Sequence, residues 1–141
     1  MEHMQIRMAK MEDLDEIAFV ESECFPFGEA ATKEKFAERI KEYGTHFWLM
    51  CEEEKVIAFV DGMVTDEKNL TDEMYEKACL HDEKGAWQMI FGVNTLPKYR
   101  RQGYAEKLLR YAINDARAQD REGLVPVSYT HLRAHETDQY L

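Results

Sequence analysis

The sequence predicts an α/β domain in which helices cover a central sheet. The first observation is a nearly continuous apolar run at residues 87–95, which is typical of a strand buried in the middle of a sheet. The second is a pair of amphipathic helices that precede this run. The third is a basic, glycine-containing turn that leads from the apolar strand into a further helix. A chain of 141 residues fits one domain of ordinary size.

The first third of the chain predicts one strand and two helices. Residues 5–8 alternate as a short strand does, and Asp13 with Glu16 provides a cap and a carboxylate for a first helix. The break at residues 25–28 ends this helix. Thr32 caps a second helix, and Gly44 ends it. The apolar face of the first helix consists of Leu14, Ile17, Ala18 and Cys24, and that of the second of Phe36, Ile40 and Tyr43.

The middle and the end of the chain predict three more strands, a helix and a last strand. Residues 46–51 and 56–64 form a hairpin around the polar turn 52–55. A charged connection with a short helix near residues 71–78 leads to the apolar strand. The helix at residues 105–119 buries Leu108, Leu109, Ala112, Ile113 and Ala116, and a strand begins at residue 124 after Gly123.

The charge and the cysteines restrict the class of protein. There are 18 basic and 28 acidic residues, so the net charge of −10 is unfavourable for nucleic-acid binding. No signal peptide and no apolar run long enough to span a membrane are present, so we expect no membrane contact. Cys24, Cys51 and Cys79 are widely spaced and odd in number, which predicts free thiols in a reducing cytoplasm.

The turn at residues 99–105 carries the strongest functional signal. It has the pattern Arg100-x-x-Gly103-x-Ala105 between a strand and a helix. The first amides of a helix have no partner within it and lie at the positive end of its dipole, so a diphosphate fits there. Gly103 allows close approach of a ligand, and Ala105 allows close packing of the helix. The glycine patterns of P-loop and dinucleotide-binding proteins are absent.

This pattern resembles the acetyl-CoA signature of the GNAT superfamily of N-acetyltransferases. Residues 93–100 resemble the strand, proline-containing turn and loop of that family, and the order of elements agrees with the first two-thirds of its domain. The resemblance implies a mixed central sheet flanked by helices, with acetyl-CoA wedged between the fourth and fifth strands. The implied reaction is acetyl transfer from acetyl-CoA to a primary amine.

The resemblance also implies a set of cofactor-binding residues. The main chain of Val93 and Thr95 would bind the pantetheine, and the Val93 N–H would stabilise the charge that develops on the thioester oxygen. Arg100 would add positive charge at the diphosphate. The amides of the loop would come from Arg101, Gln102, Gly103, Tyr104 and Ala105.

Residues 59–80 and 25–36 are similar to bacterial relatives of the arylalkylamine (serotonin-type) N-acetyltransferases. The animal enzymes of that group have two histidines on the cofactor strand, and Met89 and Phe91 occupy those positions here. The histidine-based proton route is therefore absent. A water chain that ends on Gln88, Asp61 or Glu29 is an alternative, and the catalytic base stays unassigned.

The last residues predict a different origin. Residues 127–137 resemble a translated sequencing adapter, and residues 138–141 would be further adapter sequence. We therefore expect a truncated acetyltransferase domain at residues 1–126 that lacks its C-terminal third, followed by a non-native tail. His131 and His135 would then be accidental, Tyr129 and Tyr140 would have no catalytic role, and we predict no metal site.

The sequence leaves three interpretations of the function open. The chain is an acetyl-CoA-dependent N-acetyltransferase for a small amine such as an arylalkylamine, or an enzyme of the same family that acts on a protein or another amine. Alternatively, it is a non-catalytic acyl-CoA-binding or regulatory domain. If the domain is truncated, its sheet has an open edge, and the 141-residue chain is expected to be poorly stable and inactive.

Overall fold

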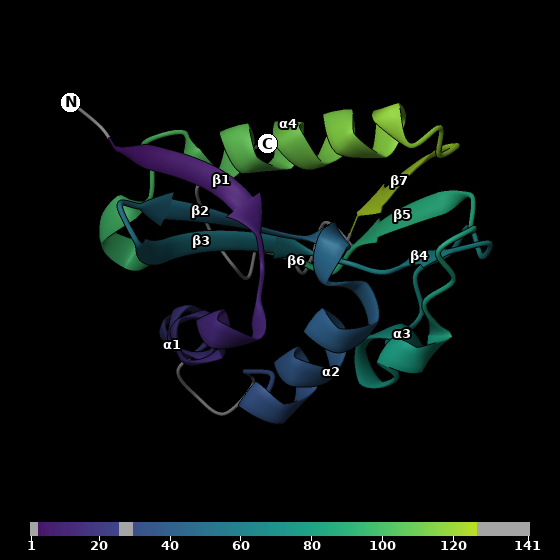
Figure 1. Cartoon of the computed structure of the whole chain (residues 1–141), viewed down its shortest axis with the longest axis horizontal. Coiled ribbons are helices and arrows are strands. Elements are labelled where there is room, and N and C mark those ends of the chain that lie inside the picture. The colour runs from purple at the N-terminus through teal and green to yellow at the C-terminus, as the bar shows by residue number, and fades with distance from the viewer. Residues whose placement is uncertain (1–2, 26–29, 127–141) are drawn as a thin grey trace.

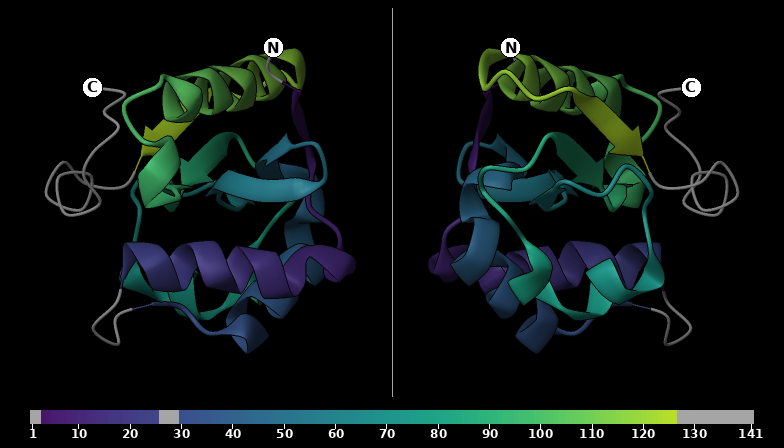
Figure 2. Two further views of the ribbon diagram at one scale, coloured as in Figure 1. Left: turned by 90° about the vertical axis from the view of Figure 1, so that its left-hand side faces the viewer. Right: turned by 90° about the vertical axis from the view of Figure 1, so that its right-hand side faces the viewer.

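A central sheet separates one long helix on one face from three helices on the other (Figures 1 and 2). This computed structural model describes residues 3–25 and 30–126. The helices are α1 Leu14–Cys24, α2 Lys33–Tyr43, α3 Asp72–Glu76 and α4 Tyr104–Ala118. The strands are β1 Met4–Met8, β2 Phe47–Glu52, β3 Lys55–Asp61, β4 Val64–Thr65, β5 Trp87–Ile90, β6 Gly92–Thr95 and β7 Gly123–Pro126. Short 3-10 turns cover Met11–Asp13, Gly44–His46, Ala78–Leu80 and Pro97–Tyr99.

The predicted mixed α/β sheet is confirmed, with strands in two hydrogen-bonded groups. β1, β2, β3 and β6 pair in that order, all antiparallel. The second group has the order β4-β5-β7, in which β5 and β7 are parallel. α4 packs on one face of the sheet, mainly over β2, β3 and β6, while α1 covers β3 and β6 from the other face (Figure 1).

The apolar run at residues 87–95 is two strands, and the sequence-based expectation of one strand is wrong at Phe91. The Phe91 N–H donates to the Asp61 carbonyl at 2.7 Å, although Asp61 is paired with Gly92 in the register. Phe91 and Gly92 therefore both lie opposite Asp61, as in a β-bulge. β3 ends at the same level, and the following Gly62 approaches β5 so closely that a Cβ on it would lie 1.9 Å from the Met89 carbonyl oxygen. The bulge divides the run into β5, which pairs with β4 and β7, and β6, which pairs with β3.

The helix α1 begins without the predicted Asp13 cap. The Asp13 backbone is already helical, and its carboxylate accepts hydrogen bonds from the Lys10 N–H at 2.8 Å and from both terminal nitrogens of Arg7. The hydrogen bond from Arg7 holds the pKa of Asp13 below its usual value. Asp13 thus fixes the preceding 3-10 turn to β1, and the buried face of α1 is formed by Ile17, Val20 and Glu21.

The predicted helix α2 is confirmed together with its cap. The Thr32 side chain accepts a hydrogen bond from the Lys35 N–H at 3.2 Å. Gly44 follows the last helical residue, but its φ of −56° is right-handed, so the chain continues into a 3-10 turn instead of a left-handed cap. The apolar side chains of the predicted stripe, Phe36, Ile40 and Tyr43, are all buried.

Removal of the Thr32 hydroxyl is expected to destabilise the protein. Thr32→Ala leaves the Lys35 N–H without its acceptor, so we expect a loss of about 1 kcal/mol in the free energy of unfolding. Urea denaturation measures this change. Thr32→Ser keeps the hydroxyl and serves as the matched control, and equal stability of the alanine and serine variants would contradict the role of the cap.

Candidate functional site

Three residues of the turn between β6 and α4 are exposed to solvent, namely Arg101, Gln102 and Gly103. Arg101 and Gly103 both adopt left-handed backbone conformations, with φ of 65° and 85°. The Lys107 N–H donates to the Gly103 carbonyl at 3.1 Å as the helix begins, so amides ahead of Lys107 have no carbonyl acceptor within α4. Gly103 is the N-cap and contributes no side chain, and a Cβ placed on it would meet no atom within 4 Å. Ala105 is buried and lets α4 pack closely on the sheet.

The side chains of this turn contact the turn itself and the end of β6. The Arg100 Nε donates to the Thr95 carbonyl at 3.0 Å, and its Nη2 lies 3.4 Å from the Cys24 Sγ. The Gln102 amide donates to the Lys98 carbonyl at 3.1 Å. The Arg100 guanidinium therefore lies against the end of β6 and Cys24, and its contribution of charge at the diphosphate stays a prediction.

The strand β6 has one paired edge and one open edge among the described residues. β3 pairs with one edge, while β7 pairs with β5. The Leu96 N–H bonds to the Ile57 carbonyl, and hydrogen-bonded positions alternate along an antiparallel pair, so the main chains of Val93 and Thr95 face the open edge. The Thr95 carbonyl confirms this direction, because it accepts from Arg100 and from the Cys24 thiol at 3.5 Å.

A buried carboxylate of α1 lies against the face of β6. The two oxygens of Glu21 accept hydrogen bonds from the Asn94 side-chain amide at 2.6 Å and from the Ala31 N–H at 2.8 Å. Burial raises the pKa of Glu21 to about 7, and the nearby Asp61 carboxylate adds to this effect. The sequence analysis missed Glu21, although it interrupts an apolar face at the spacing Leu14, Ile17, Glu21 and Cys24.

A family model described as the acetyltransferase (GNAT) family matches residues 10–137. The chain belongs to this family. The match continues past residue 126, where the sequence analysis places a domain boundary; that boundary and the tail lie at the limit of the described residues and stay predictions. No curated protein matches the sequence.

Solved structures of GNAT proteins share the fold at low sequence identity. The loading GNATL domain of CurA from Lyngbya majuscula is 23% identical, with 92% of this chain and 68% of that chain covered and a TM-score of 0.79. The GphF GNAT-like decarboxylase in complex with isobutyryl-CoA is 24% identical, with coverage of 92% and 70% and a TM-score of 0.78. The aminoglycoside N-acetyltransferase AAC(6')-Iy in complex with CoA is 14% identical, with coverage of 93% and 80% and a TM-score of 0.66. At these identities the likeness concerns the fold.

In this GNAT chain, the two strand positions that lack histidine and the residues considered for proton transfer make the following contacts. Met89 is fully buried, and Phe91 packs against Tyr75 with ring centroids 4.7 Å apart. Gln88 donates its amide to the carbonyls of Gly62 and Met89 at 2.7 and 2.8 Å and so links Gly62 to β5. Glu29 lies outside the described residues.

Asp61 is another of these residues, and it forms a buried ion pair. Its carboxylate accepts from Arg39 Nη1 at 3.2 Å, and both side chains are shielded from solvent. Arg39 also donates to the Tyr75 carbonyl at 3.1 Å and lies between the rings of Phe36 and Phe91, at 5.2 and 5.4 Å from their centroids. Burial raises the pKa of Asp61, and Arg39 counteracts this effect. Asp61 therefore anchors α2 to the bulge.

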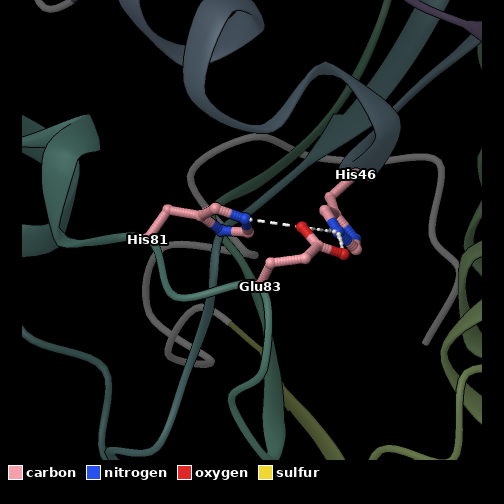
Figure 3. Close-up of side chains that lie close together, drawn as sticks. All are labelled: His46, His81 and Glu83. Atoms are coloured by element: carbon pink, nitrogen blue, oxygen red, sulfur yellow. Dashed lines mark hydrogen bonds and ion pairs between the residues drawn. The ribbon is translucent and has the colours of Figure 1, made fainter.

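Two histidines and a carboxylate come together beside the start of β2, and the sequence analysis did not find them. Figure 3 shows the side chains of His46, His81 and Glu83 close together. One potential ligand atom from each lies within 4.8 Å of the others. The Nε2 atoms of His46 and His81 lie 3.0 and 2.8 Å from the Glu83 carboxylate. Hydrogen bonds from both histidines outweigh burial and lower the pKa of Glu83.

The protons of this cluster are arranged for hydrogen bonding and against metal ligation. His81 Nδ1 accepts from the Val64 N–H at 3.0 Å, which assigns the proton to Nε2, the atom that faces Glu83. Ligating histidines need the reverse, a bare ring nitrogen toward the metal and an N–H on the other side that meets an acceptor. His46 Nδ1 is buried and has no hydrogen-bond partner among the described residues. Arg121 also pairs with Glu83 at 3.1 Å, so we interpret the cluster as a structural link.

Proposed function

We propose that this chain transfers the acetyl group of acetyl-CoA to a primary amine. The observation that carries the proposal is the open edge of β6 next to the amide-rich start of α4, in a chain of the acetyltransferase family. Structures with the same fold include an aminoglycoside N-acetyltransferase with bound CoA and a GNAT-like decarboxylase with an acyl-CoA. No helix within residues 3–25 and 30–126 has both the length and the apolar character needed to cross a membrane.

The residues of the open edge and the turn fit acetyl-CoA. The main chains of Val93 and Thr95 would bond the amides of the pantetheine, and the Thr95 hydroxyl is buried with no hydrogen-bond partner among the described residues. The Arg100 guanidinium, which donates a hydrogen bond to the Thr95 carbonyl, would lie beside the cofactor. The diphosphate would bind the amides of the turn and of the start of α4, which are those of Arg101, Gln102, Gly103, Tyr104 and Ala105.

The reaction forms an N–C bond and breaks the C–S bond of the thioester. An alkylammonium ion has a pKa of about 10, so it must lose a proton before its nitrogen can attack the carbonyl carbon. The carbonyl oxygen then becomes negative, and the Val93 N–H at the open edge is the donor proposed to stabilise it. The attached nitrogen then loses its second proton, the C–S bond breaks, and the departing CoA thiolate takes up a proton.

An arylalkylamine is the acceptor that we favour. The sequence similarity to arylalkylamine N-acetyltransferases over residues 59–80 supports this choice. The segment includes α3, and the ring centroid of Tyr75 of α3 lies 4.7 Å from that of Phe91 at the bulge, while Tyr43 of α2 meets the Phe91 ring in an edge arrangement at 6.4 Å. Aromatic side chains are therefore gathered near the cofactor strand. Tyr43 also contacts the His81 ring, and Phe91 the Arg39 guanidinium, so an assay with a panel of amines decides the acceptor.

Release of free CoA thiol in the presence of an amine panel tests the proposal. The panel contains phenylethylamine, tryptamine, a polyamine, an aminoglycoside and a peptide amino terminus. Turnover with an arylalkylamine is the expected result, and turnover only with the peptide would favour a protein substrate. Acetyl-CoA binding without turnover of any amine would support the non-catalytic interpretation. The 141-residue chain is compared with a gene product that continues natively after residue 126, which also tests the expected inactivity of the former.

A further inference from the structure

The proposed reaction requires a proton acceptor near Val93, and β6 has a polar face next to it. Side chains alternate along a strand, so Gly92 and Asn94 lie on the face that α1 covers, and Val93 and Thr95 on the α4 face. Asn94 on this face is buried and donates to Glu21 of α1. A Cβ on Gly92 would meet only the Asn94 side chain, at 3.6 Å or more. The absent side chain of Gly92 thus leaves a space of about the size of a methyl group beside Asn94.

We propose that Glu21 is the general base of this protein and accepts the ammonium proton of the amine, directly or through one water molecule. The inference rests on the proposed acetyl transfer. In this step an N–H bond of the ammonium ion breaks, its electron pair stays on nitrogen to attack the thioester carbon, and the proton moves to a Glu21 oxygen. The proton then leaves to solvent, and the enzyme returns to its starting state.

The electrostatic surroundings of Glu21 suit this role. A carboxylate with the ordinary pKa of about 4.3 is a weak base for an ammonium ion, whereas burial raises the pKa of Glu21 to about 7. The charged groups that face it are Asp61 of β3, which raises this pKa, and Arg39 of α2, which lowers it. On the same helix, burial raises the pKa of the Cys24 thiol, so this group stays neutral.

Hydrogen bonds hold the Glu21 carboxylate but leave it able to take a proton. The donors Asn94 and Ala31 occupy one lone pair on each oxygen, and each carboxylate oxygen has two. Asp61 is less suited, because Arg39 is paired with it and favours its charged form. Met89 and Phe91 cannot carry a proton. Among the described residues considered for proton transfer, Glu21 is therefore the best placed.

The substitution Glu21→Gln tests the inference in the form of the protein that turns over amines. We expect kcat/KM for an alkylamine to fall about 100-fold or more, which is the usual contribution of a general base. Trifluoroethylamine is already unprotonated at neutral pH, so the loss with this amine should be much smaller. The wild-type kcat/KM for the alkylamine should rise with pH through about 7, and the variant should lack this limb.

Two controls separate a base from a structural residue. Glu23→Gln removes a carboxylate from the exposed side of the same helix and should leave both rates unchanged. The Glu21→Gln variant should keep its fold, because an amide flip of Asn94 restores a hydrogen bond to the new side chain, and calorimetry should give an unchanged Kd for acetyl-CoA. Should the variant still misfold, the pH profile of the wild-type protein and the 13C chemical-shift titration of Glu21 remain as tests.

The outcomes distinguish the inference from the proposed function. Wild-type turnover with equal loss for the alkylamine and trifluoroethylamine, or with no loss in Glu21→Gln, overturns the role of Glu21 and leaves the acetyl transfer standing. The role of Glu21 is also overturned if the wild-type kcat/KM does not rise with pH near 7, or if the Glu21 carboxyl titrates near the pKa of an ordinary glutamate. A wild-type protein that acetylates no amine overturns both.

Discussion

A bulky side chain at position 103 is expected to abolish acetyl-CoA binding. The φ of 85° at Gly103 lies in the left-handed region, which costs most other residues about 1–2 kcal/mol. Valine is β-branched and fits this region especially poorly, so Gly103→Val should move the backbone that aims the amides of the turn. Each lost hydrogen bond to a charged group costs about 1.5–3 kcal/mol, so the loss of two reduces affinity at least about 100-fold.

A second substitution at position 103 distinguishes backbone strain from steric blocking of the diphosphate. Asparagine tolerates the left-handed conformation, so Gly103→Asn should keep the backbone of the turn. Its side chain extends into the open space next to Gly103, where the Cβ meets no protein atom within 4 Å. If the diphosphate lies in that space, Gly103→Asn also loses affinity although its melting temperature is unchanged. Calorimetric titration with acetyl-CoA measures both variants, and wild-type affinity in Gly103→Val would refute the assignment of the turn.

The features that the sequence predicted are those that neighbouring residues determine. Thr32 caps α2 through a hydrogen bond to a residue three positions away, and the helical spacing of its apolar residues indicates the buried face. Gly103 and Ala105 mark the start of α4 in the same local manner. Such patterns depend on the backbone geometry of one element, so they can be read without knowledge of what packs against it.

The features that the sequence analysis missed depend on packing between distant segments. Glu21 meets Asn94 across 73 residues, and His46 meets Glu83 across 37. The bulge at Phe91 is equally invisible in a nearly continuous apolar run, because it depends on how Phe91 and Gly92 pair with Asp61 of a distant strand. Asp13 has the residue type and position of a cap, but Arg7 on β1 binds its carboxylate instead. In each case the local sequence is compatible with more than one role for the residue, and a tertiary contact determines which role it has.

These missed contacts are also those that build the candidate site. The bulge at Phe91 separates β5 from β6 and so leaves one edge of β6 open among the described strands. Asp61 is at the centre of this arrangement, since its carbonyl accepts the Phe91 N–H and its carboxylate accepts from Arg39. The local sequence therefore specifies the diphosphate end of the proposed site, and the buried polar contacts specify the end where acetyl transfer would occur.

The buried pair of Arg39 and Asp61 should consequently be important for stability. Arg39→Met keeps a long apolar side chain between Phe36 and Phe91 but leaves the Asp61 carboxylate buried without its partner. Removal of one member of a buried ion pair costs about 3–5 kcal/mol, which is a large part of the stability of a small domain. The same substitution in the exposed pair of Arg110 and Glu106 is the matched control, and we expect it to cost less than about 1 kcal/mol.

The loss of stability caused by Arg39→Met should depend on pH, and the direction of this dependence follows from the ionisation of Asp61. Burial raises the folded-state pKa of Asp61, so the folded protein holds this proton more tightly than the unfolded chain, and stability falls as the pH rises between the two pKa values. Without Arg39 the folded-state pKa rises further. The destabilisation should therefore be smallest in acid, where Asp61 is protonated in both states, and should grow toward neutral pH. Urea denaturation at several pH values measures this trend, and adding Asp61→Asn should remove the part due to Asp61, leaving the part due to Glu21, whose pKa Arg39 also lowers. A cost independent of pH would show that Arg39 acts through packing alone.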